Sequence, residues 1–361
     1  MHNKISETKT LHGDAFQWKA DHVPFGIWVV DKAKQQSIST DDPLFIQKMY
    51  ERQLTIVQDT MRIPSDLIPT LGVTSYGCAL VPSLLGAKLT ASSVDADRIE
   101  DLGYWIKPIE NLPDVLHSLE KKEYHSSFFD QVLQQIEYYK RNKPENIWLS
   151  SSNVGPLTVA ELIRGSDFYM DLVDDPPFVH ELLRLCTDAV IDSLKTMRRV
   201  AGYPETVEGG FPSCFGIYAP GIRLGDDTIF NLSEDMIREY VIPCYERIAQ
   251  SLHSPLVIHF CSVHKPEGRQ IIRALADCDA VAAVSTQLGY ELYDEFEDQI
   301  RGKLAIECGY GQGIAYGIQK YGSFRKFAEH IKSKKNPGMI MYTTVFSSEE
   351  ANQLWNEWSS I

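Results

Sequence analysis

The sequence predicts an α/β protein, a single-domain (β/α)8 TIM barrel, and three observations support this prediction. Short apolar runs of strand length alternate with helix-like segments, which is the pattern of a parallel sheet. The length of 361 residues fits such a barrel with insertions. No G-x-G-x-x-G motif follows the first apolar run, which disfavours the rival fold, an open doubly wound sheet.

The strand candidates are short apolar runs. In chain order they are FGIWVV (25–30), DLIPTLG (66–72), IWLSSS (147–152), TVEGG (206–210), LVIHF (256–260), AVAAVS (280–285), KLAIE (303–307) and MIMYTTV (339–345). The active site of a barrel lies at the carboxyl ends of its strands. We therefore consider the polar residues just past these runs as candidates: Asp31, His259, Cys261, Ser285, Gln287, Glu307 and Cys308.

Helix-like segments separate these runs. The clearest cover residues 178–200, 233–252, 266–277, 288–300 and 318–333. The segment 233–252 begins with Ser233 as a predicted N-cap, with acidic residues in its first turn. The stretch GYGQG (309–313) reads as a flexible glycine-rich turn without the lysine and spacing of a phosphate-binding loop.

Composition excludes several classes of protein. The chain has 43% apolar and 23% charged residues and a net charge of −14, which disfavours nucleic-acid binding and weighs against a polyanionic substrate. The start of the chain is polar, and no apolar run approaches the length of a membrane span. We expect a cytoplasmic protein of one domain over residues 1–361, with residues 1–20 as an N-terminal extension.

The seven cysteines are scattered and odd in number, so they do not suggest a disulfide framework. His259 and Cys261 are two residues apart at a strand end, so both side chains point to the same side. Imidazole and thiolate are preferred zinc ligands. Cys308, at another strand end, is a candidate third ligand that would leave the open position of a catalytic zinc site. Glu307 and His264 are further candidates, and packing roles remain the alternative.

A second cluster is the segment Arg223-Leu224-Gly225-Asp226-Asp227. Arg223 and Asp227 are candidate catalytic residues, because paired acids beside an arginine can bind substrate or transfer a proton. The same acids can equally belong to a loop that caps a helix, and the sequence leaves both readings open.

Three blocks resemble the uroporphyrinogen decarboxylase superfamily. They are VPSLLGAKLT (81–90), GPLTVAELIRGSDFYMDLVDDPPFVHELL (155–183) and GDDTIFNLSEDMIREYVIPCYERI (225–248). The resemblance spans most of the chain, with the blocks in the family's order. It implies a (β/α)8 barrel with a deep cleft at the carboxyl ends of the strands.

One branch of that superfamily contains zinc-dependent corrinoid:thiol methyltransferases, whose metal is held by an H-x-C pair and a later cysteine. His259-Phe260-Cys261 is similar to this pair in type, spacing and place. The other branch contains cofactor-free decarboxylases that grip carboxylates with arginines in an "RQAGRY"-like motif. The matching region here, WVVDKAKQQS (28–37), has no arginine, which favours the methyltransferase branch.

The chain departs from the methyltransferases at their third ligand, a cysteine in a turn after the last strand. The matching segment, residues 341–347, reads MYTTVFS and contains no cysteine. Cys308 or Glu307 would then replace that ligand, or the site would be lost.

The resemblance implies zinc as cofactor, a small-molecule thiol as methyl acceptor and a corrinoid carried by a partner protein as methyl donor, with a homodimer as an option. Two alternatives stay open. One is a metal-independent decarboxylase acting on a tetrapyrrole or another carboxylated compound. The other is a relative in which the H-x-C pair serves packing alone.

Overall fold

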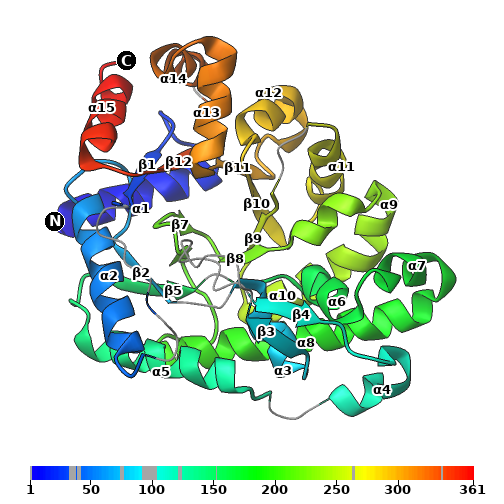
Figure 1. The fold of residues 1–361 in the computed structure, drawn as a ribbon. Helices are drawn as coiled ribbons and strands as arrows, with labels where there is room; N and C mark the ends of the chain where they lie inside the picture. Colours follow the sequence, from blue (N-terminus) through cyan, green and yellow to red (C-terminus); the bar gives the residue numbers. More distant parts are fainter. Residues whose placement is uncertain are drawn as a thin grey trace.

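A curled parallel sheet forms the centre of the molecule (Figure 1). The computed structural model describes residues 2–31, 38, 42–73, 77–91, 104–120, 124–151, 153–261, 265–334 and 336–361. Six parallel strands pair in the order β1-β12-β11-β10-β9-β8. Their bounds are β1 (Phe25–Val29), β8 (Ile222–Gly225), β9 (Leu256–His259), β10 (Val281–Thr286), β11 (Ala305–Cys308) and β12 (Met339–Val345).

A second parallel pair, β2 (Thr70–Val73) and β5 (Trp148–Ser151), lies beside the edges of this sheet. A single bridge between Val154 and Gly225 joins the end of the β5 segment to β8. At the other edge, the Asp66 N–H donates to the Phe25 carbonyl at 2.9 Å. The described residues therefore form a six-stranded half-barrel, with the β2 segment next to β1 at one edge and the β5 segment next to β8 at the other. Strand pairing among the described residues does not close an eight-stranded ring.

Most of the expected strands are present, but the run 206–210 is not a strand. Gly209 and Gly210 have φ angles of 72° and 100°, which lie in the left-handed region and break an extended run. Instead, the chain forms a short antiparallel pair, β6 (Phe211–Pro212) and β7 (Tyr218–Ala219), before it enters β8. A further antiparallel pair, β3 (Lys88–Ala91) and β4 (Tyr104–Lys107), was not expected.

The expected helix 318–333 consists of two helices, α13 (Tyr310–Tyr321) and α14 (Phe324–Ser333). Gly322 ends the first with a φ of 86°, and the Ser323 side chain caps the second by accepting the Lys326 N–H. The expected glycine-rich turn at 309–313 is also corrected, because α13 begins within it.

The segment 233–252 is helical as expected but changes its winding. Ser233 is the N-cap and accepts the Met236 N–H at 3.2 Å. The chain continues as α9 (Glu234–Met236), a π-helical turn η4 (Ile237–Val241) and α10 (Ile242–Leu252). Pro243 has no N–H to donate to the preceding turn, which accounts for the wider winding ahead of it.

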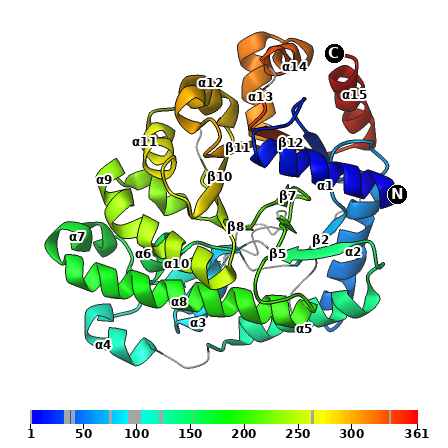
Figure 2. The same ribbon diagram turned by 180° about the vertical axis from the view of Figure 1, so that it is seen from behind.

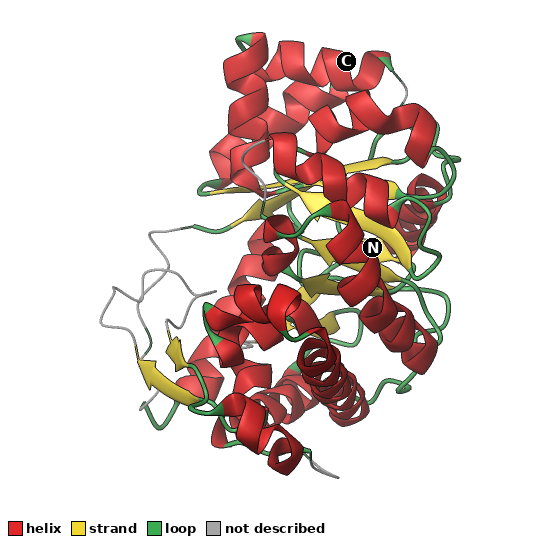
Figure 3. Cartoon of the chain, turned by 90° about the vertical axis from the view of Figure 1, so that its right-hand side faces the viewer, coloured by secondary structure: helices red, strands yellow, loops and turns green. Residues whose placement is uncertain are grey.

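The remaining helices pack around the strands (Figure 3). They are α1 (His2–Phe16), α2 (Phe45–Thr60), α3 (Leu80–Leu84), α4 (Leu112–Leu119), α5 (Ser127–Asn142), α6 (Pro156–Arg164), α7 (Asp167–Asp174), α8 (Pro176–Ala201), α11 (Lys265–Leu275), α12 (Gly289–Ile300) and α15 (Ser348–Ser359), with 3-10 turns η2 (Gly77–Ala79) and η3 (Asp227–Asn231). None of the described helices combines the length and apolar character needed to cross a membrane.

Small apolar side chains fill the amino-terminal side of the sheet's concave face. Ala219, Val257, Ala283 and Ala305 form a buried cluster, and Phe16 of α1 packs against it. Helix α1 lies across this part of the molecule, against β7 and β12 (Figure 2). Because side chains alternate along a strand, the residues two positions further on face the same interior nearer the carboxyl ends.

Candidate active site

A layer of polar side chains lies next to the apolar cluster inside the sheet. Ser285 of β10 is in register with both His259 of β9 and Glu307 of β11, and all three residues are buried. They follow Val257, Ala283 and Ala305 by two positions on their strands, so they share one face of the sheet. The sheet thus places an imidazole, a hydroxyl and a carboxyl at one level near the carboxyl ends of its strands.

Three potential metal ligands converge at the carboxyl ends of β8 and β9. The ligand atoms of Asp227, His259 and Cys261 all lie within 4.8 Å of one another. The Cys261 Sγ is 3.5 Å from the His259 Nε2, and the Cys261 N–H donates to the Asp227 Oδ1 at 2.7 Å. We call these three residues the triad. His259 is buried, whereas Asp227 and Cys261 are exposed, so the triad opens toward solvent on one side.

Cys261 and His259 have the spacing of two ligands on one zinc ion. Tetrahedral zinc with bonds of about 2.3 Å to sulfur and about 2.0 Å to nitrogen separates these two ligand atoms by about 3.5 Å. This is the separation between Cys261 Sγ and His259 Nε2. A carboxylate, an imidazole and a thiolate form a donor set that zinc accepts, and three protein ligands leave one position for a further molecule.

The surroundings of His259 favour the neutral form that a metal ligand needs. Burial and the nearby Arg223 guanidinium hold the pKa of His259 well below its usual value of 6.5. Its Nδ1 lies 3.4 Å from the Ser285 Oγ, so an Nδ1–H can donate to this hydroxyl. In that tautomer the lone pair of Nε2 is directed toward the Cys261 sulfur.

The Cys261 thiol has a raised pKa, first because it is partly buried and second because of the Asp227 carboxylate. The Gln287 Nε2–H donates to the Cys261 Sγ at 3.4 Å and lowers the same pKa. In the protein alone the thiol form is therefore favoured, and metal binding would release its proton.

Asp226 and Asp227 are neighbours with different surroundings. The Asp226 carboxylate is fully buried and accepts the Thr158 N–H at 2.7 Å and the Tyr245 O–H at 3.0 Å. It therefore satisfies the amino terminus of α6, while burial raises its pKa to about 6. The helix-capping reading is confirmed for Asp226, whereas the roles in substrate binding or proton transfer stay predictions, and Asp227 joins the triad.

Arg223 of β8 is connected to the triad through Ser285. Its Nη2 donates to the Ser285 Oγ at 2.9 Å and to the Tyr342 hydroxyl at 3.1 Å. Its Nε lies 3.5 Å from the Glu307 Oε2, and both side chains are largely buried. The guanidinium also lies 4.8 Å from the centre of the Phe215 ring. The interior therefore contains one charge-matched pair joined to His259 by a hydroxyl.

The structure does not bring Cys308 into the triad, which corrects the expectation that it supplies the third ligand. Cys308 follows Glu307 on β11, so its side chain points away from the concave face. Its thiol donates to the Gln287 carbonyl at 3.5 Å and lies near Gly313 of α13. Burial raises the pKa of Cys308 to about 12, which suits a packing residue. Asp227 occupies the place beside the H-x-C pair instead.

His264, a further candidate ligand, lies outside the described residues. The Tyr342 hydroxyl, in the segment 341–347, accepts a hydrogen bond from Arg223, and the Phe215 ring lies against the same guanidinium. Neither residue was predicted from the sequence. The position of Tyr342 in the run MIMYTTV carried a signal, since a polar group within a buried strand needs an interior partner.

Comparisons with known proteins identify the fold and leave the activity open. No protein-family model and no curated protein matches the chain. Among solved structures, a methyltransferase from Methanosarcina mazei is similar, with a TM-score of 0.65. The two share 13% of their residues, and the likeness covers 98% of each chain. The chain therefore has the fold of that structure over its whole length.

Proposed function

We propose that this chain is a zinc-dependent methyltransferase with a (β/α)8 architecture, which moves a methyl group between a corrinoid or similar donor and a thiol acceptor. The observation that carries the proposal is the triad, with its ligand atoms within 4.8 Å at the carboxyl ends of β8 and β9. The resemblance of three sequence blocks and the structural likeness to a methyltransferase support it. This assigns to Asp227 the place that a second cysteine takes in the family pattern.

In this proposal His259, Cys261 and Asp227 hold the metal, and their neighbours fix their orientation. When bound, zinc would supply a Lewis acid that lowers the pKa of the acceptor thiol. Ser285 holds the His259 ring in its neutral tautomer, and Gln287 directs an N–H at the Cys261 sulfur. The exposed side of the triad leaves room for the acceptor to approach from solvent.

The methyl group would pass to the acceptor sulfur as a sulfur–carbon bond forms and the donor–methyl bond breaks. The donor keeps the electron pair of that bond, which is the behaviour of a methylated corrinoid. Since a corrinoid is large and the triad lies at the exposed strand ends, the donor would be carried by a partner protein docking over them. Arg223 would contact the acceptor. A reducing cytoplasm would keep the thiol of the acceptor from forming a disulfide.

The alternative, a metal-independent decarboxylase of a polycarboxylated substrate, has less support. Such a substrate needs an excess of positive charge in the cleft. Arg223 is matched by Glu307 at 3.5 Å, so this pair adds no net positive charge to the interior. The net charge of −14 weighs in the same direction.

The proposal is tested by the metal content of the protein, purified without a histidine tag and analysed by mass spectrometry. We expect about one zinc per chain in the wild type and in Cys308→Ala, and a loss of zinc in Cys261→Ala and Asp227→Ala. Circular dichroism would verify that the variants fold. A wild type that takes up no zinc on titration would contradict the proposal, and loss in Cys308→Ala would contradict our assignment of the third ligand.

A second assay addresses the reaction itself. The zinc-loaded protein would be mixed with methylcobalamin and a panel of small thiols, and loss of the methyl–cobalt absorption would be followed. We expect transfer to at least one thiol in the wild type and none in Cys261→Ala. If the protein binds zinc but transfers no methyl group from free or protein-bound methylcorrinoid to any thiol, the proposed methyltransferase activity is wrong. The zinc site would then belong to an enzyme of another class.

A further inference from the structure

Gly225 lies between Arg223 and the triad at the carboxyl end of β8. Arg223 points into the interior of the sheet, where it contacts Ser285. Because side chains alternate along a strand, a side chain at residue 225 would face the same interior. Gly225 is in register with His259 on the neighbouring strand β9. Paired strands lie about 4.8 Å apart, so residue 225 is directly beside the buried member of the triad.

Neither close packing nor backbone conformation requires a glycine at residue 225. Apart from its chain neighbours, a Cβ atom there would meet one atom of the described residues within 4 Å, the Asn153 carbonyl oxygen at 3.7 Å, which is an ordinary contact. The φ angle of Gly225 does not lie in the left-handed region. Its backbone is paired as in any strand, since its N–H donates to the Asn153 carbonyl at 2.8 Å and its carbonyl accepts the Gly155 N–H at 2.7 Å.

A glycine in a strand is destabilising, because it loses more conformational freedom on folding than other residues and has no side chain to pack. Such a glycine often marks a place where a ligand approaches the backbone closely. Gly225 is partly exposed, although His259 beside it is buried. The other two triad residues, Asp227 and Cys261, are exposed as well. A ligand can therefore reach the strand both at the triad and at residue 225.

We infer that the acceptor thiol binds with its sulfur at the triad and its first carbon atoms over Gly225, so that residue 225 sets how much bulk the acceptor carries beside its sulfur. The inference rests on the proposed methyltransferase function and names the class of acceptor. Because Gly225 has no side chain, the space over it accepts a thiol that is branched at the carbon next to sulfur. Arg223, two residues earlier on the same face, lies toward the other end of the acceptor.

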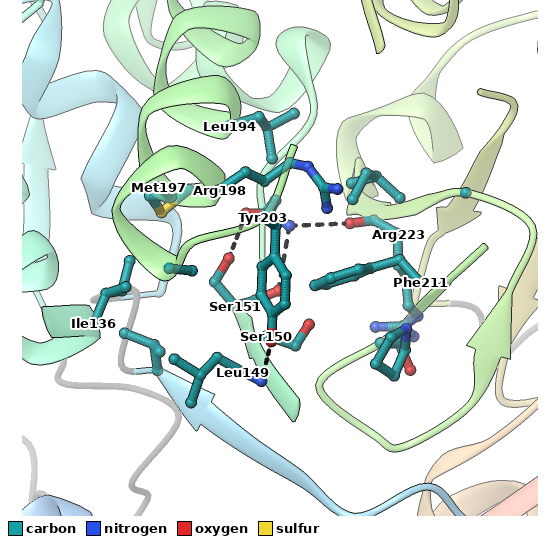
Figure 4. A pocket seen from close by; sticks show the side chains of 17 residues that line it. Ile136, Leu149, Ser150, Ser151, Leu194, Met197, Arg198, Tyr203, Phe211 and Arg223 are labelled. Carbon is teal, nitrogen blue, oxygen red and sulfur yellow. Dashed lines mark hydrogen bonds between the residues drawn. The ribbon is translucent and has the colours of Figure 1, made fainter. Parts of the chain in front are cut away.

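A cavity between β5 and the helices α5 and α8 also borders β8 (Figure 4). Its lining includes Ile222 and Arg223 of this strand but neither Gly225 nor any residue of the triad. An acceptor held by its sulfur at the triad therefore has Gly225, and not this cavity, beside its first carbon atoms. The cavity supplies a control, because Ala201 of α8 lines it and a larger residue there would narrow it.

The test compares propane-1-thiol with propane-2-thiol, two isomers that differ in branching at the carbon next to sulfur. Isothermal titration calorimetry measures their binding to the zinc-loaded full chain in the absence of a methyl donor, and we expect the wild type to bind both. Gly225→Ala should lower the affinity for propane-2-thiol relative to propane-1-thiol by at least about tenfold, because one methylene group can change selectivity by about 10- to 200-fold. Gly225→Val adds more bulk and should lower this ratio further.

Two control variants should keep the wild-type ratio of the two affinities. Gly72→Ala adds a methyl group to another strand glycine, where the Cβ atom would lie 3.8 Å from the Gln53 Oε1 of α2. Ala201→Leu narrows the cavity between β5, α5 and α8. Zinc content and circular dichroism verify that each variant folds and keeps the triad.

The outcomes separate this inference from the proposed function. A wild type that takes up no zinc, or that binds neither thiol when loaded with zinc, would contradict the proposed function and the inference together. An affinity ratio that stays at the wild-type value in Gly225→Ala would overturn the inference alone. So would a zinc-loaded wild type that binds propane-1-thiol but not propane-2-thiol, and this result decides even if neither Gly225 variant folds.

Discussion

The carboxylate of Asp226 fills the space directly beside Gly155, where a larger residue would place its Cβ atom. Gly155 has a φ of −82°, which any residue adopts, so the glycine is required by space and not by its backbone conformation. Its neighbour Pro156 begins α6, and the Asp226 carboxylate satisfies the amino terminus of that helix. The contact joins two of the sequence blocks that carry the family resemblance.

Gly155→Ala should therefore destabilise the fold. The added methyl group displaces a buried carboxylate with fixed partners, and we expect the free energy of unfolding to fall by about 2 to 3 kcal/mol. Urea denaturation followed by circular dichroism measures this change. Gly13→Ala is the matched control, since a Cβ at Gly13 of α1 meets no atom within 4 Å. Equal stability of Gly155→Ala and wild type would contradict the contact.

His12 makes the stability of the protein depend on pH. Its ring is fully buried in α1, where Nδ1 accepts the Tyr218 N–H and Nε2 donates to the Asp66 carbonyl, both at 3.0 Å. Burial lowers the pKa of His12 from 6.5 to about 4. Between these two pH values the unfolded chain binds one proton more than the folded chain at this residue. Its stabilising contribution is complete above pH 6.5 and decreases as the pH falls toward 4.

We expect this single residue to remove about 3 kcal/mol of stability between pH 6.5 and 4. Comparing the unfolding free energies of wild type and His12→Gln separates the contribution of His12 from those of the other titrating groups. The variant should be less stable than wild type at pH 7, and the difference should shrink as the pH falls to 4. A difference between the two unfolding free energies that stays constant with pH would show that His12 is not the group responsible.

The pair formed by Arg223 and Glu307 should show strong energetic coupling. Burial raises the pKa of Glu307 and the Arg223 guanidinium opposes this rise, so the carboxylate depends on its partner. Glu307→Met leaves a buried guanidinium without a matching charge and should cost about 3 to 5 kcal/mol of stability. The double variant Arg223→Met with Glu307→Met should recover part of this loss. A double-mutant cycle in urea measures the coupling, and simple additivity would contradict the buried pair.

Gln287 should tune the metal affinity without being a ligand. Its Nε2–H donates to the Cys261 sulfur at 3.4 Å, an interaction that stabilises a thiolate. If the triad holds zinc, Gln287→Leu should weaken zinc binding by about tenfold, because such supporting contacts commonly contribute about 10- to 100-fold in affinity. Competition with a chromogenic chelator measures the affinity. An affinity equal to that of wild type would assign Gln287 to packing alone.

The sequence predicted the regular part of the fold well, because apolar runs reveal buried strands. The run 339–345 coincides with β12, and 256–260 differs from β9 by one residue. Where a conformation depends on backbone freedom, the prediction was wrong. Gly209 and Gly210 end an apparent strand, and Gly322 divides an apparent helix, because positive φ angles interrupt patterns that side chains alone suggest.

In the candidate site, too, strand periodicity predicted some features, whereas others depend on tertiary structure. Two-residue spacing on one strand predicted that His259 and Cys261 face the same side, and the structure confirms it. The choice of Cys308 followed its chemistry as a soft ligand, although its neighbour Glu307 occupies the inward direction at that level of the sheet. The approach of Asp227 to Cys261 depends on how the chain turns after β8, a tertiary feature that strand periodicity does not contain.

Asp226 and Asp227 are joined by one peptide bond, yet the first is fastened to the start of α6 and the second to the backbone of Cys261. Because the two residues are consecutive, these contacts couple the amino terminus of α6 to the backbone at Cys261. The same coupling would make an insertion between the two residues more damaging than replacement of either one.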